Sequence, residues 1–168
     1  MVYNYLEKTW YFGNLSCTAW IDKGIEDDPT AASAGFLYRH EVGNDDGSTN
    51  PVSSITSFIE SSQIDIGDGD RFMFMRRVVP DLTFVGSTSD APSANFTMKA
   101  RNFPGGNYLQ SDENSVTRSA TSPVEQFTDQ VFVRLRGRSF AVRVESTAQG
   151  TQWRFGAPRV DIRPDGRQ

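Results

Sequence analysis

The chain has 168 residues, of which 37% are hydrophobic and 23% charged, and its formal net charge at pH 7 is −4. This length fits one domain, or one domain with a small appendage, with about 70% of the unfolded surface buried on folding. A single cysteine and a single histidine exclude an internal disulfide and a Cys/His zinc site. No stretch reaches the roughly 18 apolar residues of a membrane span, and the N-terminus lacks a signal-peptide pattern, so we expect a soluble protein made in a cytoplasm.

The charges are distributed unevenly along the chain. Residues 1–70 carry twelve acidic and three basic side chains, whereas residues 131–168 carry eight arginines and three acids. Fourteen of the seventeen basic residues are arginine. Because the guanidinium group favours fixed, bidentate contacts with carboxylates and phosphates, we expect organised contacts rather than a merely solvated surface.

Phenylalanine, tyrosine, tryptophan and valine dominate the apolar residues, which favours strands over helices. In residues 1–47 we expect strands at 2–12, 16–21 and 35–42, followed by a turn at 43–47. These N-terminal strands form the first predicted part of the chain, and residues 48–168 form the second.

The second part begins with residues 52–64, where Ile55 and Ile59 have a helical spacing but the serines and threonine favour an extended strand. Further strands are expected at 71–79, from Leu82, and at 95–101, where apolar and polar residues alternate. The polar residues 107–123 are expected to form a long loop.

The last quarter alternates between apolar and arginine-bearing positions. Residues 131–136 and 140–145 flank a turn and predict a β-hairpin with one arginine-bearing face. Shorter strands follow around residues 153–155 and 159–163. Strands at this spacing predict an all-β fold, either an antiparallel β-sandwich of jelly-roll type or a small barrel.

An acidic loop offers a weak calcium candidate. Asp65, Asp68 and Asp70 are separated by glycines and could gather carboxylate oxygens around a hard cation. Their spacing does not match an EF-hand loop, and a solvated turn explains the same residues. We therefore predict no metal and no other cofactor.

Candidate catalytic groups do not form a recognisable set. His40, the only histidine, alternates with aromatic residues on a predicted strand and is interpreted as a packed or edge residue. Cys17 has no neighbouring base to activate it. Adjacent acids, Asp45 with Asp46 and Asp112 with Glu113, sit in turns and point apart, unlike the paired acids of glycosidases. We predict that the protein is not an enzyme.

An arginine array is the remaining candidate site. We assign it as an interface formed by Arg134, Arg136, Arg138, Arg143, Arg154, Arg159 and Arg163. The array could be a solvated face, bind nucleic-acid phosphates, or contact the acidic half of a neighbouring copy. Between the last two, we favour subunit contact because Glu145 and Asp161 interrupt the array and the whole chain is acidic.

Several stretches resemble a known family. The ending, residues 152–167, and the preceding residues 133–139 resemble the C-terminal region of tail hub, nozzle or DNA-stabilisation proteins of short-tailed bacteriophages. Residues 2–5 with Trp10, and then 18–20 and 35–38, are similar to the closing blade of the β-propeller in that family. Residues 102–106 and 123–127 carry further similarity.

The resemblance implies a structural protein of the virion tail. It implies a ring, usually sixfold, built from copies of the chain and contacting other tail proteins, with DNA passing through the lumen. Two alternatives stay open: a capsid decoration protein, and a carbohydrate- or receptor-binding β-sandwich in which aromatic residues such as Trp10, Trp20 or Tyr108 stack on sugar rings.

Overall fold

The computed structural model describes residues 1–6, 8–13, 16–25, 27–65, 68–103 and 118–166. All regular elements in these ranges are β-strands, which confirms the predicted all-β class. The same ranges contain no helix long and apolar enough to cross a bilayer. The chain divides into two compact units, Met1–Gly43 and Asn44–Gln168, which we describe separately.

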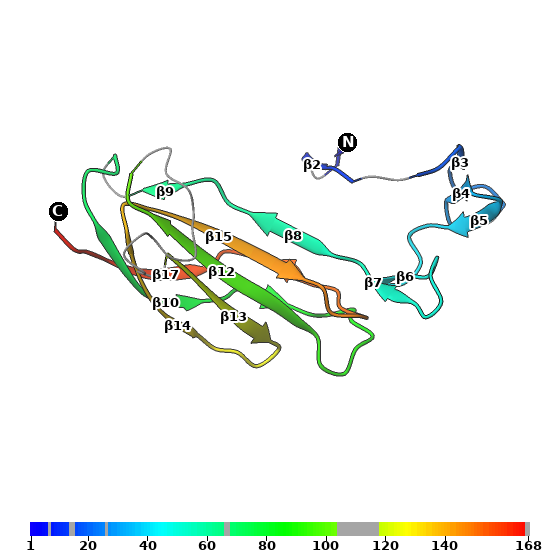
Figure 1. The fold of residues 1–168 in the computed structure, drawn as a ribbon. Helices are drawn as coiled ribbons and strands as arrows, with labels where there is room; N and C mark the ends of the chain where they lie inside the picture. The colour runs from blue at the N-terminus through cyan, green and yellow to red at the C-terminus, as the bar shows by residue number, and fades with distance from the viewer. Residues whose placement is uncertain (7, 14–15, 26, 66–67, 104–117, 167–168) are drawn as a thin grey trace. The chain divides into compact units, whose positions relative to one another are not determined.

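The first unit contains a hairpin and a three-stranded antiparallel sheet (Figure 1). Its strands are β1 (Val2–Asn4), β2 (Thr9–Tyr11), β3 (Ala19–Ile21), β4 (Thr30–Ser33) and β5 (Phe36–Arg39). The single strand predicted over residues 2–12 is wrong, since β1 pairs with β2. Asn4 makes the turn: its Oδ1 accepts the Leu6 N–H at 3.1 Å. Strand β4 escaped prediction because its small and polar residues carry almost no apolar signal.

The first unit buries little apolar surface of its own. Among its described side chains only Pro29 and Ala31 are buried. Its exposed large apolar side chains are Met1, Tyr3, Tyr5, Leu6, Trp10, Phe12, Trp20, Ile21, Ile25, Phe36, Leu37 and Val42. Clusters of exposed apolar side chains commonly mark surfaces that contact another polypeptide.

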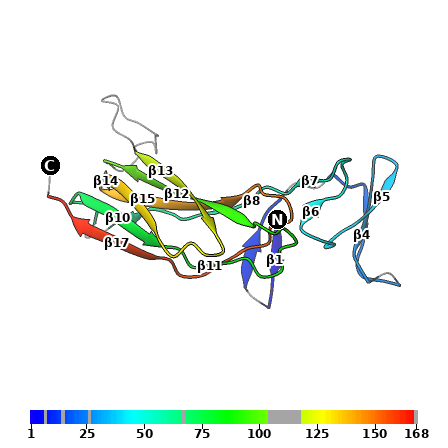
Figure 2. The same ribbon diagram turned by 90° about the horizontal axis from the view of Figure 1, so that it is seen from below.

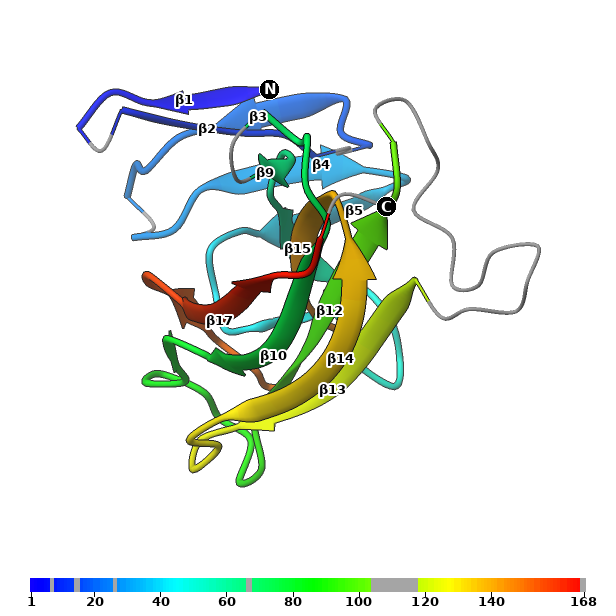
Figure 3. The same ribbon diagram turned by 90° about the vertical axis from the view of Figure 1, so that its left-hand side faces the viewer.

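The second unit is a β-sandwich of two antiparallel sheets (Figures 1 and 3). One sheet has the order β14–β10–β17, formed by Val131–Gly137, Met73–Val79 and Arg159–Pro164. The other has the order β13–β12–β15–β8, formed by Ser119–Glu125, Ser93–Arg101, Ser139–Ser146 and Ser57–Glu60, with β9 (Ile64–Asp65) also paired to β15.

Two small sheets complete this unit. Strands β6 (Asp45–Asp46) and β7 (Ser53–Ser54) pair with each other, and β11 (Leu82–Thr83) pairs with β16 (Arg154–Phe155). Strand β10 continues through Pro80 into β11, whose place is visible in Figure 2. The extended conformation predicted for residues 52–64 is confirmed by β7, β8 and β9.

Alternating residues of the two large sheets form the core between them. On β14, Val131, Val133 and Leu135 are buried while the residues between them are exposed, as the period of two predicts. The opposing layer contributes Phe96 and Phe140, both with 0% exposure. The sequence pattern thus identifies which side of each long strand faces the core.

The predicted hairpin between residues 131–136 and 140–145 is wrong. Strand β14 pairs with β10, whereas β15 pairs with β12, β8 and β9 in the other sheet. The chain therefore crosses from one layer to the other at Gly137, where a Cβ would lie 3.0 Å from both the Ala100 Cβ and the Arg101 carbonyl oxygen. Alternation alone cannot distinguish this crossing from a hairpin, because both place apolar residues toward the core.

The end of the predicted 107–123 loop is also corrected. Residues 119–123 belong to β13, which pairs with β12 from Ser93↔Glu125 to Lys99↔Ser119. The strand lies at the edge of its sheet, and Val124 is its only buried residue, so it carries almost no alternating signal. Pro123 is compatible with an edge strand because one side of that strand needs no ladder bond. Residues 107–117 lie outside the described residues.

Candidate functional site

Five of the seven predicted arginines lie in the two large sheets of the sandwich. Arg134 and Arg136 lie on β14, and Arg159 and Arg163 lie on β17, in the same three-stranded sheet. Arg143 lies on β15 in the other sheet, so the prediction of one continuous arginine-bearing face is wrong for this residue. The remaining two occupy other places: Arg138 follows the end of β14, and Arg154 lies in β16.

The outward side of the three-stranded sheet gathers most of the array, and we call it the arginine face. Its members are Phe74, Arg76, Arg77, Phe132, Arg134, Arg136, Arg159, Asp161 and Arg163. Cross-strand register places Phe74 between Arg136 and Arg163, and Arg77 between Phe132 and Asp161. The face therefore extends across all three strands.

Arg76 and Arg77 were missed by sequence reasoning. They are consecutive and both exposed in β10, where the register shifts between Met75 and Arg77. A bulge of this kind lets two successive side chains reach the same side of a sheet. Two adjacent arginines inside an otherwise apolar strand are the sequence signal that could have predicted this bulge.

Most charge on the arginine face has no internal counter-charge. Arg136 pairs with Asp165, and the Arg163 Nε lies 3.9 Å from the Asp161 Oδ1. The other four arginines, Arg76, Arg77, Arg134 and Arg159, form no ion pair with any described residue. Six arginines against these two aspartates give a local charge of +4.

An exposed aromatic ring lies among these charges. The Phe132 side chain is 73% exposed and points outward from β14 opposite Arg77. An exposed aromatic surrounded by arginines is typical of protein interfaces, which are enriched in both residue types. Nothing in the core requires this phenylalanine, since its neighbours Val131 and Val133 supply the buried contacts of β14.

Phe72 orders the arginines at one end of the face. The Arg136 guanidinium lies 4.0 Å from the centroid of its ring, and that of Arg138 lies 4.8 Å from it. Arg138 Nη1 also donates to the Asp70 carbonyl oxygen at 3.4 Å. Arg138 is thus tied to the loop before β10.

Arg143 belongs to an ion-pair network on the outer side of the other sheet. Its Nε donates to Glu145 Oε2 at 2.6 Å, and its Nη1 lies 3.1 Å from Glu60 Oε2. Lys99 Nζ lies 2.8 Å from the other Glu60 oxygen. Hydrogen bonding from Lys99, together with the nearby Arg143, lowers the pKa of Glu60. The sequence pattern predicted that Glu145 interrupts the arginine array. This prediction is wrong, because Glu145 lies on β15 in the other sheet and not on the arginine face.

Because of this network, we expect the free energy of unfolding to depend on pH in the acid range. A lowered folded-state pKa stabilises the fold above the ordinary glutamate value of 4.5, and this contribution disappears as the pH falls through the folded-state value. We expect Glu60→Gln to lower the free energy of unfolding near pH 7 by about 1 kcal/mol or less. The difference from wild type should vanish in acid, as measured by urea unfolding across a pH series.

Glu125→Gln is the matched control for that series. Glu125 is exposed on β13 and forms no ion pair with the described residues, so this variant should match wild type near pH 7. A Glu60→Gln deficit that persists unchanged below the acid transition would contradict the electrostatic account.

The calcium candidate does not assemble. The described part of the chain contains no group of three or more His, Cys, Asp or Glu side chains arranged to hold a metal ion. Asp65 lies at the end of β9, and Asp68 has a left-handed backbone conformation with φ of 58°. Asp65 therefore belongs to a strand, whereas Asp68 and Asp70 lie in the turn that follows the strand.

The described groups that were weighed for catalysis make other contacts. The His40 ring packs against Trp20 with 4.8 Å between ring centroids, and Cys17 is exposed. Asp45 accepts the Gly150 N–H with both carboxylate oxygens, at 2.7 and 2.9 Å, which is a structural role. Asp112 and Glu113 lie outside the described residues.

The tryptophans proposed for sugar stacking are accessible. Trp10 is 66% exposed and packs its ring against Tyr3 at 4.5 Å, and Trp20 is 49% exposed. Tyr108 lies outside the described residues.

Comparison with protein-family models finds no match to this chain, and comparison with curated proteins finds none either.

Proposed function

We propose that this protein is a non-enzymatic structural component of a phage tail that assembles with other copies of itself into a ring. The resemblance of residues 133–139 and 152–167 to tail hub and nozzle proteins supports the tail role. The observation that carries the assembly role is the arginine face, with four arginines lacking an ion-pair partner among the described residues around the exposed Phe132.

The partner of the arginine face is an acidic protein surface. The aromatic ring favours a protein over a phosphate backbone, because its burial adds apolar contact that phosphates cannot provide. Arginine forms paired hydrogen bonds with carboxylates, which fix the orientation of the partner.

A second copy of the chain supplies the complementary charge. Residues 1–70 carry a net charge of −9, from twelve acids and three bases, against +4 on the arginine face. Two different surfaces that bind each other make a head-to-tail contact, and such contacts generate closed rings when the rotation between subunits closes. This complementary charge and the family resemblance together support the proposed ring.

Sedimentation velocity over a concentration series tests the assembly role. We expect the wild-type protein to form discrete oligomers whose population rises with concentration and falls with added salt. A chain that stays monomeric at every concentration would contradict the proposal. Steeply salt-dependent binding to duplex DNA without self-association would instead assign the arginines to phosphate contacts.

Phe132→Ser should weaken this assembly by tenfold or more without unfolding the chain. Removing an aromatic residue from the centre of an interface costs about 2 kcal/mol or more, whereas an exposed side chain contributes little to the free monomer. The measurement is the association constant by sedimentation, beside the thermal midpoint of the monomer. Phe127→Ser is the control, because Phe127 is 88% exposed and lies outside the arginine face. Equal association of the two variants would exclude Phe132 from the interface.

A further inference from the structure

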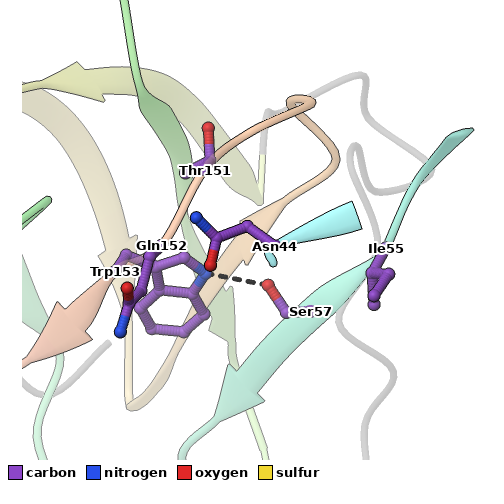
Figure 4. Close-up of a pocket in the computed structure, with 6 residues that line it drawn as sticks. All are labelled: Asn44, Ile55, Ser57, Thr151, Gln152 and Trp153. Atoms are coloured by element: carbon purple, nitrogen blue, oxygen red, sulfur yellow. Dashed lines mark hydrogen bonds between the residues drawn. The ribbon is translucent and has the colours of Figure 1, made fainter. Parts of the chain in front are cut away.

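The second unit contains a small pocket, and no residue of the arginine face lines it. It has a volume of about 280 Å³ and is lined by Asn44, Ile55, Ser57, Thr151, Gln152 and Trp153. Figure 4 shows the indole of Trp153 at its centre with the side chains of Asn44, Ser57 and Gln152 around it. The lining residues come from three separate segments, before β6, at the start of β8 and before β16.

The Trp153 indole is fixed in place by its polar edge. Its Nε1–H donates to the Ser57 Oγ at 2.8 Å (Figure 4). The apolar part of the ring packs against the core cluster of the sandwich. A held indole beside a pocket offers a preformed platform, so a ligand does not have to order it on binding.

Polar groups around the indole retain unused hydrogen-bonding capacity. Asn44 Nδ2 donates to the Gly86 carbonyl oxygen at 3.0 Å, but its Oδ1 accepts from no described residue. The Gln152 amide forms no hydrogen bond with the described residues, although its backbone N–H is bound to Ser87 Oγ at 2.9 Å. Ser57 accepts from the indole and keeps its own proton to donate.

The Gln152 amide lies beside the backbone of Gly86. Gly86 has φ of +98°, and a Cβ there would lie 2.1 Å from Gln152 Oε1. A residue with a Cβ at position 86 would therefore require the Gln152 amide to move.

The chemistry of the lining selects a neutral, hydroxyl-rich ligand. None of the six lining residues is charged, so the pocket provides no partner for a phosphate, a carboxylate or an ammonium group. Amides and a hydroxyl pair with ligand hydroxyls, and an indole packs against the C–H face of a saturated ring. A pyranose ring combines these two features.

We infer that this pocket binds one pyranose ring of a neutral sugar, packed on Trp153 and hydrogen-bonded by Gln152, Asn44 and Ser57. The volume lies just below the range of typical ligand pockets, so we expect it to admit one ring and not an oligosaccharide. The site is distinct from the exposed Trp10 and Trp20. None of the six lining residues lies on the arginine face, and sugar binding is measured by a readout separate from that of assembly.

Nuclear magnetic resonance of the full, ¹⁵N-labelled chain tests the site. The Trp153 Nε1–H resonance is assigned by its loss in Trp153→Phe and followed during separate titrations with D-glucose, D-galactose, D-mannose and N-acetyl-D-glucosamine. We expect at least one sugar to shift it saturably, with a dissociation constant in the millimolar range for so small a ligand.

Gln152→Ala provides the discriminating variant. Loss of its hydrogen bonds should weaken sugar binding about tenfold, while the fold is retained because the amide has no described partner. Gln149→Ala is the control, since the Gln149 amide donates to the Val52 carbonyl oxygen outside the pocket. Absence of a Trp153 shift with all four sugars, equal affinity of Gln152→Ala and wild type, or shifts confined to Trp10 and Trp20 would each overturn the inference. Sedimentation of the same samples reports on assembly independently.

Discussion

Replacing Phe96 by alanine is expected to lower the free energy of unfolding of the second unit by about 3–5 kcal/mol. Phe96 has 0% exposure at the centre of β12, between the two sheets. Its ring packs edge to face against Phe155, with 5.8 Å between the ring centroids. The change therefore removes buried apolar area, leaves a cavity and breaks an aromatic pair that joins β12 to β16.

Urea unfolding followed by circular dichroism measures this loss. Domains of this size are stable by only about 5–15 kcal/mol, so the variant should unfold at a much lower denaturant concentration. Phe127→Ala is the matched control, because the same truncation at an 88% exposed position should change stability by about 0.5 kcal/mol or less. Similar midpoints for the two variants would contradict the proposed core.

Gly150→Ala should cost about 2 kcal/mol or more, for two separate reasons. The backbone at Gly150 has φ of +67°, a left-handed conformation that costs a residue with a Cβ about 1–2 kcal/mol. In addition, the new Cβ would lie 2.7 Å from Thr88 Oγ1 and 3.0 Å from the Ser89 backbone nitrogen. The carbonyl oxygen of Gly150 accepts both the Thr88 and Ser89 N–H groups, so moving it disturbs bonds that join two loops.

Gly166→Ala separates the two reasons. Gly166 also has a positive φ, of +82°, but a Cβ added there would have no described atom within 4 Å, so only the backbone cost applies. The two variants are compared by thermal unfolding, and Gly150→Ala should have the lower midpoint. Equal midpoints would show that the contacts with Thr88 and Ser89 relax at no cost.

Local pattern predicted the long strands but not their partners. The alternation in residues 95–101 and 131–135 follows from burial of one face, so each strand and its inward side could be read from the sequence. Pairing depends on contacts between distant segments, such as β10 with β17, and no local signal distinguishes a crossing at Gly137 from a hairpin. Edge strand β13 was missed because it buries a single residue.

Part of the candidate site could also be predicted from the alternation of apolar and polar residues. Arg134, Arg136, Arg159 and Arg163 were assigned to an interface from alternation, and all four lie on the arginine face. Arg143 was assigned to it only through the mistaken hairpin. Arg76 and Arg77 were not predicted. They lie on the arginine face because of a bulge in β10 and the pairing of β10 with β14 and β17, which only the tertiary fold defines.

The most direct test of the central claim compares two double variants by sedimentation velocity. Arg77→Gln with Arg134→Gln removes two positive charges from the arginine face, and Lys99→Gln with Arg143→Gln removes two from the opposite sheet. The net-charge change is therefore the same. We expect the first variant to remain monomeric where wild type assembles, and the second to assemble like wild type. Assembly of both variants, or loss of assembly in both, would contradict the assignment of the arginine face as the subunit contact.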